Sequence, residues 1–182
     1  MAYVPLILAA VVVAWFVAAY NKLVRFRNQI KNAWHQIDVQ LKRRYDLIPN
    51  LVEVVKDYMS YEQETLTKVI EARGAALSAK GTAAQAKAEN VLTESLKSLF
   101  AVFENYPDLK ANQNVASLQE ELTGTENKIS FARQFYNDSV MTYNNAIQSI
   151  PSNFVASLFN FAPEAYFETE PESRAVPKAD LR

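Results

Sequence analysis

The chain has 182 residues, of which 49% are hydrophobic and 21% are charged, and its formal net charge is -1. This length suits one domain with a short additional segment, and the near-neutral charge gives no electrostatic case for nucleic-acid binding. The sequence has no Cys, one His and three widely separated Gly, which excludes disulfides, thiolate chemistry, Cys-ligated zinc and Gly-rich phosphate loops.

Residues 2–20 contain no charged side chain and read AYVPLILAAVVVAWFVAAY. A helix of about 20 residues crosses a hydrocarbon layer of about 30 Å. Pro5 falls in the first turn, where it is tolerated, and Tyr3 and Tyr20 suit the headgroup level at the two ends. A cleaved signal peptide is the alternative, but no Lys or Arg precedes the apolar run. We predict a retained transmembrane anchor over residues 1–21.

Four cations follow this segment directly: Lys22, Arg25, Arg27 and Lys31. The positive-inside rule then predicts that the N-terminus lies outside and the remaining chain lies in the cytoplasm. The same side chains are expected to contact anionic lipid headgroups. The alternative interpretation is an ordinary solvated face of a helix.

Beyond the anchor, apolar residues recur every three to four positions, which is the spacing of a helix that packs on a partner helix. Charged residues, Arg43 and Arg44 among them, are expected to lie on its flanks. The pattern ends at residues 78–81, where Gly81 suits a position just past a helix. The predicted stripe consists of Ile30, Trp34, Ile37, Leu41, Tyr45, Ile48, Val52, Val55, Met59, Glu62, Leu66, Val69 and Arg73.

Pro49 interrupts this stripe in composition but not in phase. Either the helix continues with a kink at Pro49, or the chain turns and Asn50 caps a new helix with Glu53 reaching back to it. The preserved phase favours the kinked continuous helix.

The later segments also read as helices. Thr82 is expected to begin one, with Gln85 completing a capping-box-like pair, and its apolar stripe ends near Tyr106. Pro107 and Asp108 predict a turn. A long helix is expected from about Asn112 to Ile150, with close packing at Gly124. Ser152 is expected to cap a short final helix.

Sustained alternation and Asn-Gly or Asp-Gly hairpin signals are absent from the sequence. We therefore predict an all-α protein, with an N-terminal transmembrane helix followed by an elongated antiparallel helical bundle with coiled-coil-like packing. The expected domains are the anchor (1–21), the helical bundle (22–161) and an irregular, acidic, proline-containing tail (162–182).

Several stretches of this sequence resemble the LemA family of bacterial membrane proteins. They are WHQIDVQLKRRYDLIPNLVE from Trp34, YPDLKAN from Tyr106, FARQFYNDSVMTYNNAIQSIPSN from Phe131 and AYFETEP from Ala165. The resemblance covers nearly the whole chain and departs from the family pattern at His35, where a small polar residue is more usual. It implies a single-span protein of the bacterial inner membrane with a helical domain, and it carries over no catalytic residues.

The sequence offers no catalytic or metal-binding motif. A di-iron bundle needs Glu-x-x-His motifs, but the residue three positions before the single His35 is Asn32. The neighbouring pair Glu120 and Glu121 points apart on a helix, as do Glu62 and Glu64, so each is expected to be solvated. We predict that the protein is not an enzyme, holds no cofactor or metal, and has no small-molecule substrate.

Two Tyr-Asn pairs, Tyr136-Asn137 and Tyr143-Asn144, repeat seven residues apart and predict a contact ladder on one helix face. Together with the tail aromatics Tyr166 and Phe167, they are the predicted self-contact residues. Polar residues that crowd this helix, such as Arg133 and Asn144, fit either a register-fixing network or simple solvation.

The resulting functional prediction is a non-catalytic single-pass membrane protein whose helical domain self-assembles laterally and scaffolds or shapes the membrane. Its expected partners are membrane lipids and further copies of itself, with no nucleic acid. The alternative is a membrane-anchored adaptor that recruits another membrane protein, such as a protease.

Overall fold

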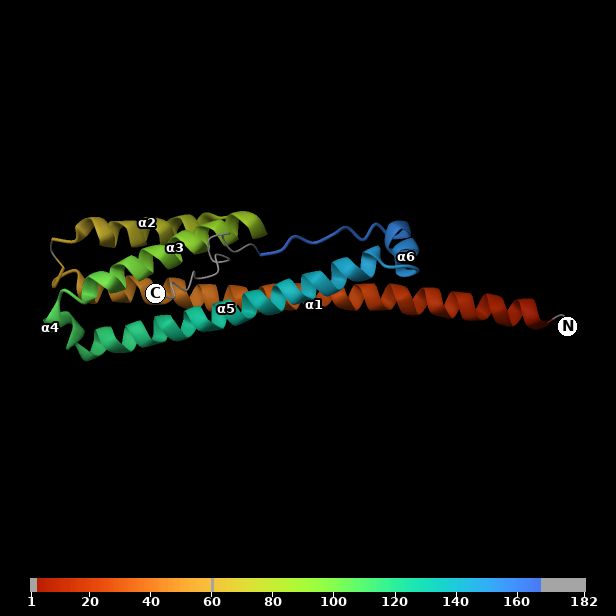
Figure 1. The fold of residues 1–182 in the computed structure, drawn as a ribbon, viewed down its shortest axis with the longest axis horizontal. Helices are drawn as coiled ribbons and strands as arrows, with labels where there is room; N and C mark the ends of the chain where they lie inside the picture. Colours follow the sequence, from red (N-terminus) through yellow and green to blue (C-terminus); the bar gives the residue numbers. More distant parts are fainter. Residues whose placement is uncertain (1–2, 60, 168–182) are drawn as a thin grey trace, which may run out of the picture. The chain divides into compact units, whose positions relative to one another are not determined.

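A computed structural model describes residues 3–59 and 61–167 of the chain. Over these residues it contains six helices and no strand (Figure 1). This confirms the all-α class, whereas the coiled-coil-like packing stays a prediction. In chain order the helices are α1 (Tyr3–Val55), α2 (Gln63–Ser78), α3 (Thr82–Phe103), α4 (Pro107–Lys110), α5 (Gln113–Gln148) and α6 (Ser152–Leu158).

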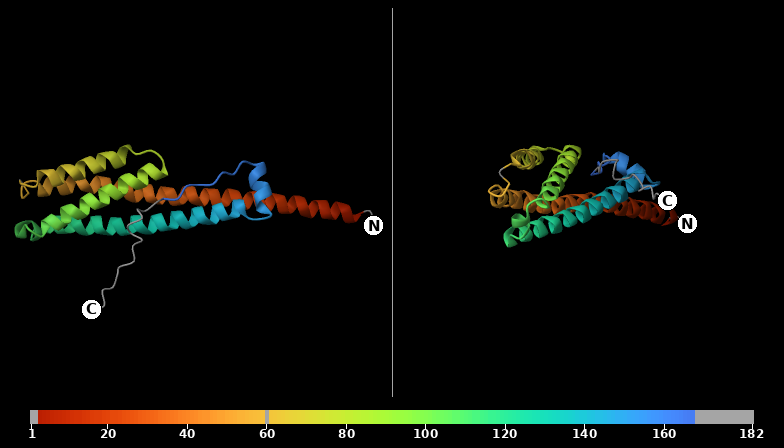
Figure 2. Two further views of the ribbon diagram at one scale, coloured as in Figure 1. Left: turned by 45° about the horizontal axis from the view of Figure 1, so that its top comes forward. Right: turned by 60° about the vertical axis from the view of Figure 1, so that its left-hand side comes forward.

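The chain divides into two compact units, and α1 and α5 contribute residues to both. The first unit contains α1 as far as Val39 and the segment Ile129–Tyr166. Within it, α1 and the C-terminal part of α5 lie side by side and antiparallel, with the Trp34 and Tyr136 ring centroids 5.5 Å apart (Figure 2). Its buried apolar side chains are Leu23, Ile30, Ala33, Ile37, Ile129, Ala132, Tyr136, Val140, Tyr143, Ile147, Val155, Ala156 and Phe161.

The second unit contains the segment Gln40–Lys128, in which α2 and α3 form an antiparallel pair beside the C-terminal part of α1 (Figure 1). The chain reverses between α2 and α3 at Gly81, whose φ of +84° is a conformation that favours glycine. Leucines spaced three and four residues apart on α3 point into the core, as expected for a helix with one buried face. The largest fully buried apolar side chains of this segment are Ile48, Leu51, Met59, Leu92, Leu99 and Leu109.

Helix α1 continues through Pro49 and ends at Val55, so the preserved apolar phase correctly favoured continuity. The stripe predicted between Ile30 and Arg73 is nevertheless interrupted, because Met59 and Glu62 lie in the connection between α1 and α2. Met59 is fully buried although it is not helical. The apolar spacing therefore persists across the connection, which is why spacing alone did not reveal the end of the helix.

Several local predictions are corrected by the structure. Pro107 begins the short helix α4 rather than a simple turn. Gln85 does not complete a capping box, because the start of α3 has no side-chain cap. Ser152 does not cap α6, because its Oγ donates to the carbonyls of Ala146 and Ser149. An added Cβ at Gly124 would meet no atom within 4 Å, so the prediction of close packing at this residue is wrong.

The ends of α5 follow its sequence closely. The carboxamide oxygen of Asn112 accepts the backbone N–H groups of Asn114 at 2.9 Å and Val115 at 3.3 Å, which caps the helix at the predicted position. The helix ends at Gln148, so Ile150 lies beyond it and is exposed rather than part of the buried stripe. Residues 161–167 have no regular structure, and the rest of the predicted tail, 168–182, lies outside the described residues.

Candidate membrane interface and buried polar contacts

The N-terminal part of α1 presents apolar side chains to its surroundings on all sides. Its most hydrophobic 18-residue window has a mean hydropathy of 2.2, and only 6% of that window is buried by the protein. A helix that is apolar all round and not covered by protein requires an apolar surrounding medium. Its large exposed side chains include Tyr3, Val4, Leu6, Ile7, Leu8, Val11, Val12, Val13, Trp15 and Val17. This segment is a candidate transmembrane helix.

The predicted basic collar follows on the same helix, and its members differ in environment. Lys22, Arg25 and Lys31 are exposed, and the Lys22 ammonium lies 5.7 Å from the Phe26 ring centroid. Arg27 is half-buried, with its guanidinium 5.0 Å from the Phe161 ring centroid. Three cations therefore remain available to lipid headgroups or solvent, while Arg27 packs against an aromatic ring of the same unit.

The predicted tyrosine-asparagine ladder of α5 binds an extended segment of its own chain. The Tyr143 hydroxyl donates to the carbonyl of Ala162 at 3.0 Å, and the Tyr136 hydroxyl donates to that of Ala165 at 2.9 Å. Between them, Asn144 donates to the carbonyl of Glu164 and accepts its N–H, both at 3.0 Å. These four hydrogen bonds attach an irregular segment to α5 by its backbone.

The electrostatic environment keeps the Tyr143 hydroxyl protonated. Burial raises its pKa above the ordinary tyrosine value, and the nearby Glu164 carboxylate raises it further, while Arg27 opposes both effects. A neutral hydroxyl is needed to donate a hydrogen bond to the Ala162 carbonyl. The shift therefore favours the protonation state in which the segment is held.

The structure thus places the predicted self-contact residues in different settings. Tyr136, Tyr143 and Asn144 are buried and bonded within the chain, and Asn137 is half-buried. Tyr166 is exposed, whereas Phe167 is buried. Contact between copies through these residues stays a prediction.

The second unit contains a buried ionic cluster, which we call the Arg44 cluster. Arg44 of α1 forms ion pairs with Glu89 of α3 and Glu126 of α5. Its guanidinium also donates to the Thr93 hydroxyl at 2.9 Å, and Thr93 donates to Glu126 at 3.1 Å. The side chains of Arg44 and Glu89 are completely buried. The cluster therefore joins three helices. The charges of Arg44 and Glu89 are removed from water, whereas the Glu126 side chain is 34% exposed.

Neutral groups complete the surroundings of Glu89. The Tyr45 hydroxyl donates to its carboxylate, and Gln85 Nε2 donates to the same group at 2.7 Å. Burial raises the pKa of Tyr45 strongly, and the hydrogen bond to Glu89 and its negative charge act in the same direction, against Arg44 and Gln85. From α2, Arg73 Nε donates to the Tyr45 carbonyl at 2.8 Å.

Sequence reasoning wrongly placed Arg44 among the flanking charges. A signal was nevertheless present, because residue 44 lies three positions after Leu41 and four before Ile48, within the buried stripe. Glu89 likewise lies three positions before the buried Leu92. A charge in phase with two separate apolar stripes indicates a buried ion pair.

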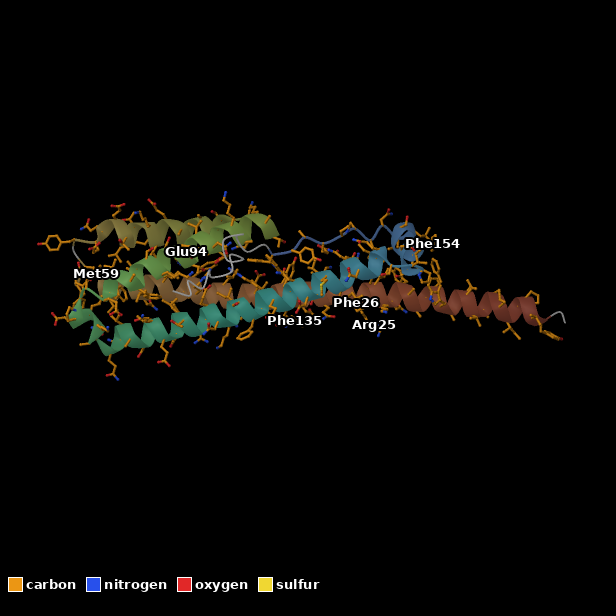
Figure 3. All side chains as sticks on the ribbon, in the orientation of Figure 1. Arg25, Phe26, Met59, Glu94, Phe135 and Phe154 are labelled. Atoms are coloured by element: carbon orange, nitrogen blue, oxygen red, sulfur yellow. The ribbon has the colours of Figure 1, made fainter. Side chains whose placement is uncertain are left out.

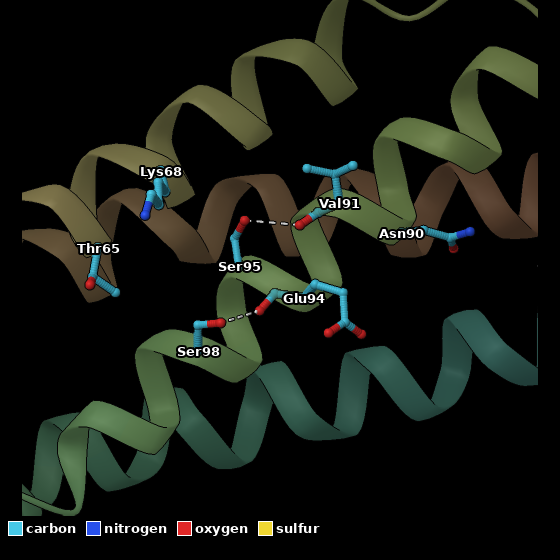
Figure 4. A pocket seen from close by; sticks show the side chains of 7 residues that line it. All are labelled: Thr65, Lys68, Asn90, Val91, Glu94, Ser95 and Ser98. Carbon is cyan, nitrogen blue, oxygen red and sulfur yellow. Dashed lines mark hydrogen bonds between the residues drawn. The ribbon is translucent and has the colours of Figure 1, made fainter. Parts of the chain in front are cut away.

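No convergent catalytic arrangement is seen in the part of the chain that the structure describes. A cleft of about 310 Å³ between α2 and α3 is lined by Thr65, Lys68, Asn90, Val91, Glu94, Ser95 and Ser98 (Figure 4). Ser95 and Ser98 donate to the carbonyls of Val91 and Glu94 in their own helix, and Lys68 pairs with Glu64. The exposed His35 is remote in sequence from these residues. The non-enzymatic assignment stays a prediction.

Taken together, the fold and the apolar segment define an all-helical protein with a candidate N-terminal transmembrane helix. The sequence profile of the LemA family matches residues 33–181. The chain therefore belongs to the LemA family, which confirms the resemblance and supports membrane association.

Curated relatives align over most of the chain. Protein LemA of Metamycoplasma hominis is 28% identical over 172 residues, which cover 92% of this chain and 77% of that protein. Magnetosome protein MamQ 2 of Paramagnetospirillum magneticum is 22% identical over 185 residues, covering 87% and 68%. Magnetosome protein MamQ of Magnetospirillum gryphiswaldense is 22% identical over 178 residues, covering 84% and 65%.

Proposed function

We propose that this chain is a non-catalytic single-pass protein of the bacterial cytoplasmic membrane whose helical domain assembles laterally with further copies. The N-terminus lies outside, and the helical domain lies in the cytoplasm. The assembly scaffolds or shapes the membrane to which it is attached. Membership of the LemA family and the candidate transmembrane helix support the membrane attachment on which this proposal rests.

The observation that carries the proposal is an exposed apolar patch on α5, made by Phe131 and Phe135. These side chains are 72% and 42% exposed and lie one helical turn apart. Figure 3 labels Phe135 on α5, within the first unit. Contiguous exposed apolar surface of this kind is typical of a protein contact surface.

The position of the patch argues against lipid as its cover. Tyr136 contacts Trp34, which lies 14 residues beyond Tyr20 on the continuous helix α1. At 1.5 Å per residue this places the patch about 20 Å beyond the end of the apolar segment. A second protein surface is then the natural cover. Copies held on one membrane have a high effective concentration, so a small patch suffices.

Cysteine crosslinking tests the contact, because the natural chain has no Cys. Phe131→Cys and Phe135→Cys chains in native membranes are expected to give crosslinked dimers with a short bis-maleimide. Glu71→Cys, an exposed position on α2, is the matched control and should crosslink far less. In parallel, gentle detergent extraction should yield particles larger than one 20.6 kDa chain with its micelle.

The double variant Phe131→Gln/Phe135→Gln should reduce the particles toward single chains while remaining in the membrane fraction. Uniformly single-chain particles of the natural protein, together with crosslinking no stronger than at residue 71, would overturn the proposal. Crosslinks that join the patch only to a different protein would instead support the adaptor alternative.

A further inference from the structure

We propose that helix α6 and the residues that flank it form a second membrane-contact element, which enters the headgroup–acyl boundary beside the transmembrane helix. The element consists of Ile150, Phe154, Leu158 and Phe159, which we call the α6 patch. This inference rests on the single-pass anchor of the proposed function, and it is independent of lateral assembly.

Helix α6 exposes its large apolar side chains and buries smaller ones. Ile150, Phe154 and Leu158 are 79%, 66% and 65% exposed, whereas Val155 and Ala156 on the same short helix are buried. Phe154 and Leu158 are four residues apart and therefore share one face of α6. Figure 3 labels Phe154 on α6. In water this arrangement would leave three large apolar side chains uncovered.

The patch lies at the level where the apolar segment of α1 ends. The Phe159 ring centroid is 4.6 Å from that of Tyr20 and 6.1 Å from that of Phe16. Figure 2 shows α6, in blue, next to α1 within this unit. If residues 3–20 cross the hydrocarbon layer, residues packed on Phe16 and Tyr20 necessarily lie at its edge. The α6 patch is thus continuous with the lipid-facing surface of α1.

The charge pattern fits a lipid surface. The sequence contains no Asp, Glu, Lys or Arg between Asp138 and Glu164, so no charge has to be desolvated when this element approaches the bilayer. A groove of about 430 Å³ joins the two elements, and Trp15, Lys22, Ile150 and Pro151 are among the residues that line it. Apolar rings at one level with a cation just beyond them match the acyl and phosphate layers of an anionic phospholipid.

The contrast with the Phe131–Phe135 patch supports lipid as the occupant. That patch lies about 20 Å farther along α1, beyond the reach of the acyl chains, as judged from the helical rise. The α6 patch instead contacts the last rings of the spanning segment. Short amphipathic elements that lie in the interface bury their apolar face about 5–10 Å into the headgroup–acyl boundary.

The test uses the full chain in vesicles of phosphatidylcholine and phosphatidylglycerol at a low protein-to-lipid ratio. Ser157→Cys places an environment-sensitive fluorophore on α6 without altering the patch, and Ser157 is exposed. We expect blue-shifted emission that is quenched by brominated acyl chains. The same fluorophore at Ser130→Cys, an exposed position on α5, is the control and should remain unquenched.

Adding Ile150→Gln/Phe154→Gln/Leu158→Gln to the labelled Ser157→Cys chain should abolish this quenching, while the chain stays in the membrane after alkaline carbonate extraction. Phe131→Gln/Phe135→Gln in the same background should leave the quenching unchanged, even if it abolishes self-assembly. A label at residue 157 that is quenched by aqueous iodide but not by brominated lipid would overturn the inference. So would a label shielded from both quenchers, since it would indicate a protein contact. Loss of the natural chain from the membrane on carbonate extraction would instead contradict the anchor itself.

Discussion

Two adjacent arginines on α1 have opposite environments. Arg44 is completely buried and paired with Glu89 and Glu126, whereas Arg43 pairs with Glu121 at 3.4 Å with both side chains about half exposed at 51%. Exposed pairs contribute little because water and salt screen them, but a buried charge that loses its partner bears its full desolvation cost. The two neighbours therefore provide a comparison within one helix.

Arg44→Met is expected to lower the free energy of unfolding by about 3–5 kcal/mol, because it leaves the buried Glu89 carboxylate without a cation. Arg43→Met, the matched control, should cost at most about 1 kcal/mol. Denaturant unfolding of the detergent-solubilised full chain, followed by circular dichroism, measures both. The double variant Arg44→Met/Glu89→Leu should recover much of the loss. Equal losses for the two single variants would contradict a structural role for the Arg44 cluster.

Periodicity predicted most of the buried apolar residues but not the buried polar ones. Ile37, Leu41 and Ile48 lie where the stripe predicted them, because the helical repeat alone determines which face meets a partner. Arg44 and Glu89 were missed because each requires knowledge of the other, and 45 residues separate them in sequence. In the same way, the ladder of Tyr136 and Tyr143 was identified, but its intrachain acceptors, the Ala165 and Ala162 carbonyls, were not.

At the scale of whole elements, the unbroken course of α1 through Pro49 needs explanation. Proline removes one backbone hydrogen bond and crowds the preceding turn, here at Tyr45. The Pro49 ring is exposed, while Ile48 and Leu51 on either side are fully buried. Burial of these neighbours against the rest of the second unit outweighs the local cost. The helix then ends only after Val55, where the chain turns and Met59 is buried by the connection.

Pro49→Ala is expected to stabilise the chain by about 1–2 kcal/mol, because alanine removes the clash in the helix interior. The hydrogen bond that it restores adds little, since the Tyr45 carbonyl already accepts Arg73 Nε at 2.8 Å. The gain is reduced by the greater freedom of the unfolded chain. The midpoint of denaturant unfolding measures it. Asn50→Ala, at the adjacent exposed position, is the control and should change stability by less than about 1 kcal/mol. A destabilised Pro49→Ala protein would show that packing in the second unit depends on the geometry that the proline imposes.

For the molecule as a whole, the sequence predicts the order of its parts better than the partners of its surfaces. A run of uncharged residues indicates a candidate transmembrane helix, since the hydrocarbon layer selects for length and hydropathy. The sequence predicts a short final helix after Ser152 but does not show which of its apolar residues are exposed. The contacts of Phe159 with Phe16 and Tyr20 place this patch beside the apolar segment of α1.

The orientation proposed for the molecule rests on the cations that follow the candidate transmembrane segment, and it can be tested. Residues 2–20 carry no cation, whereas Lys22, Arg25 and Lys31 are exposed just beyond them. Replacing these three with Gln is expected to produce a mixed population of orientations, because cations within about 15–20 residues of a spanning helix determine its topology. Arg27 is retained because its guanidinium packs on Phe161. A reporter that is active only in the cytoplasm, fused after Arg182, measures the change.

The matched control for this experiment replaces Lys42, Lys56 and Lys68, which are exposed cations farther along the chain. It removes the same charge from the protein, so it separates the position of the cations from net charge alone. This control should leave the reporter fully active, because these cations lie beyond the region that determines orientation. Unchanged activity in both variants would show that the collar does not determine the orientation. The three exposed cations would then either bind anionic headgroups or form a solvated helix face. If they bind headgroups, replacing them with Gln should reduce the blue shift of the label at residue 157 only in vesicles that contain anionic lipid.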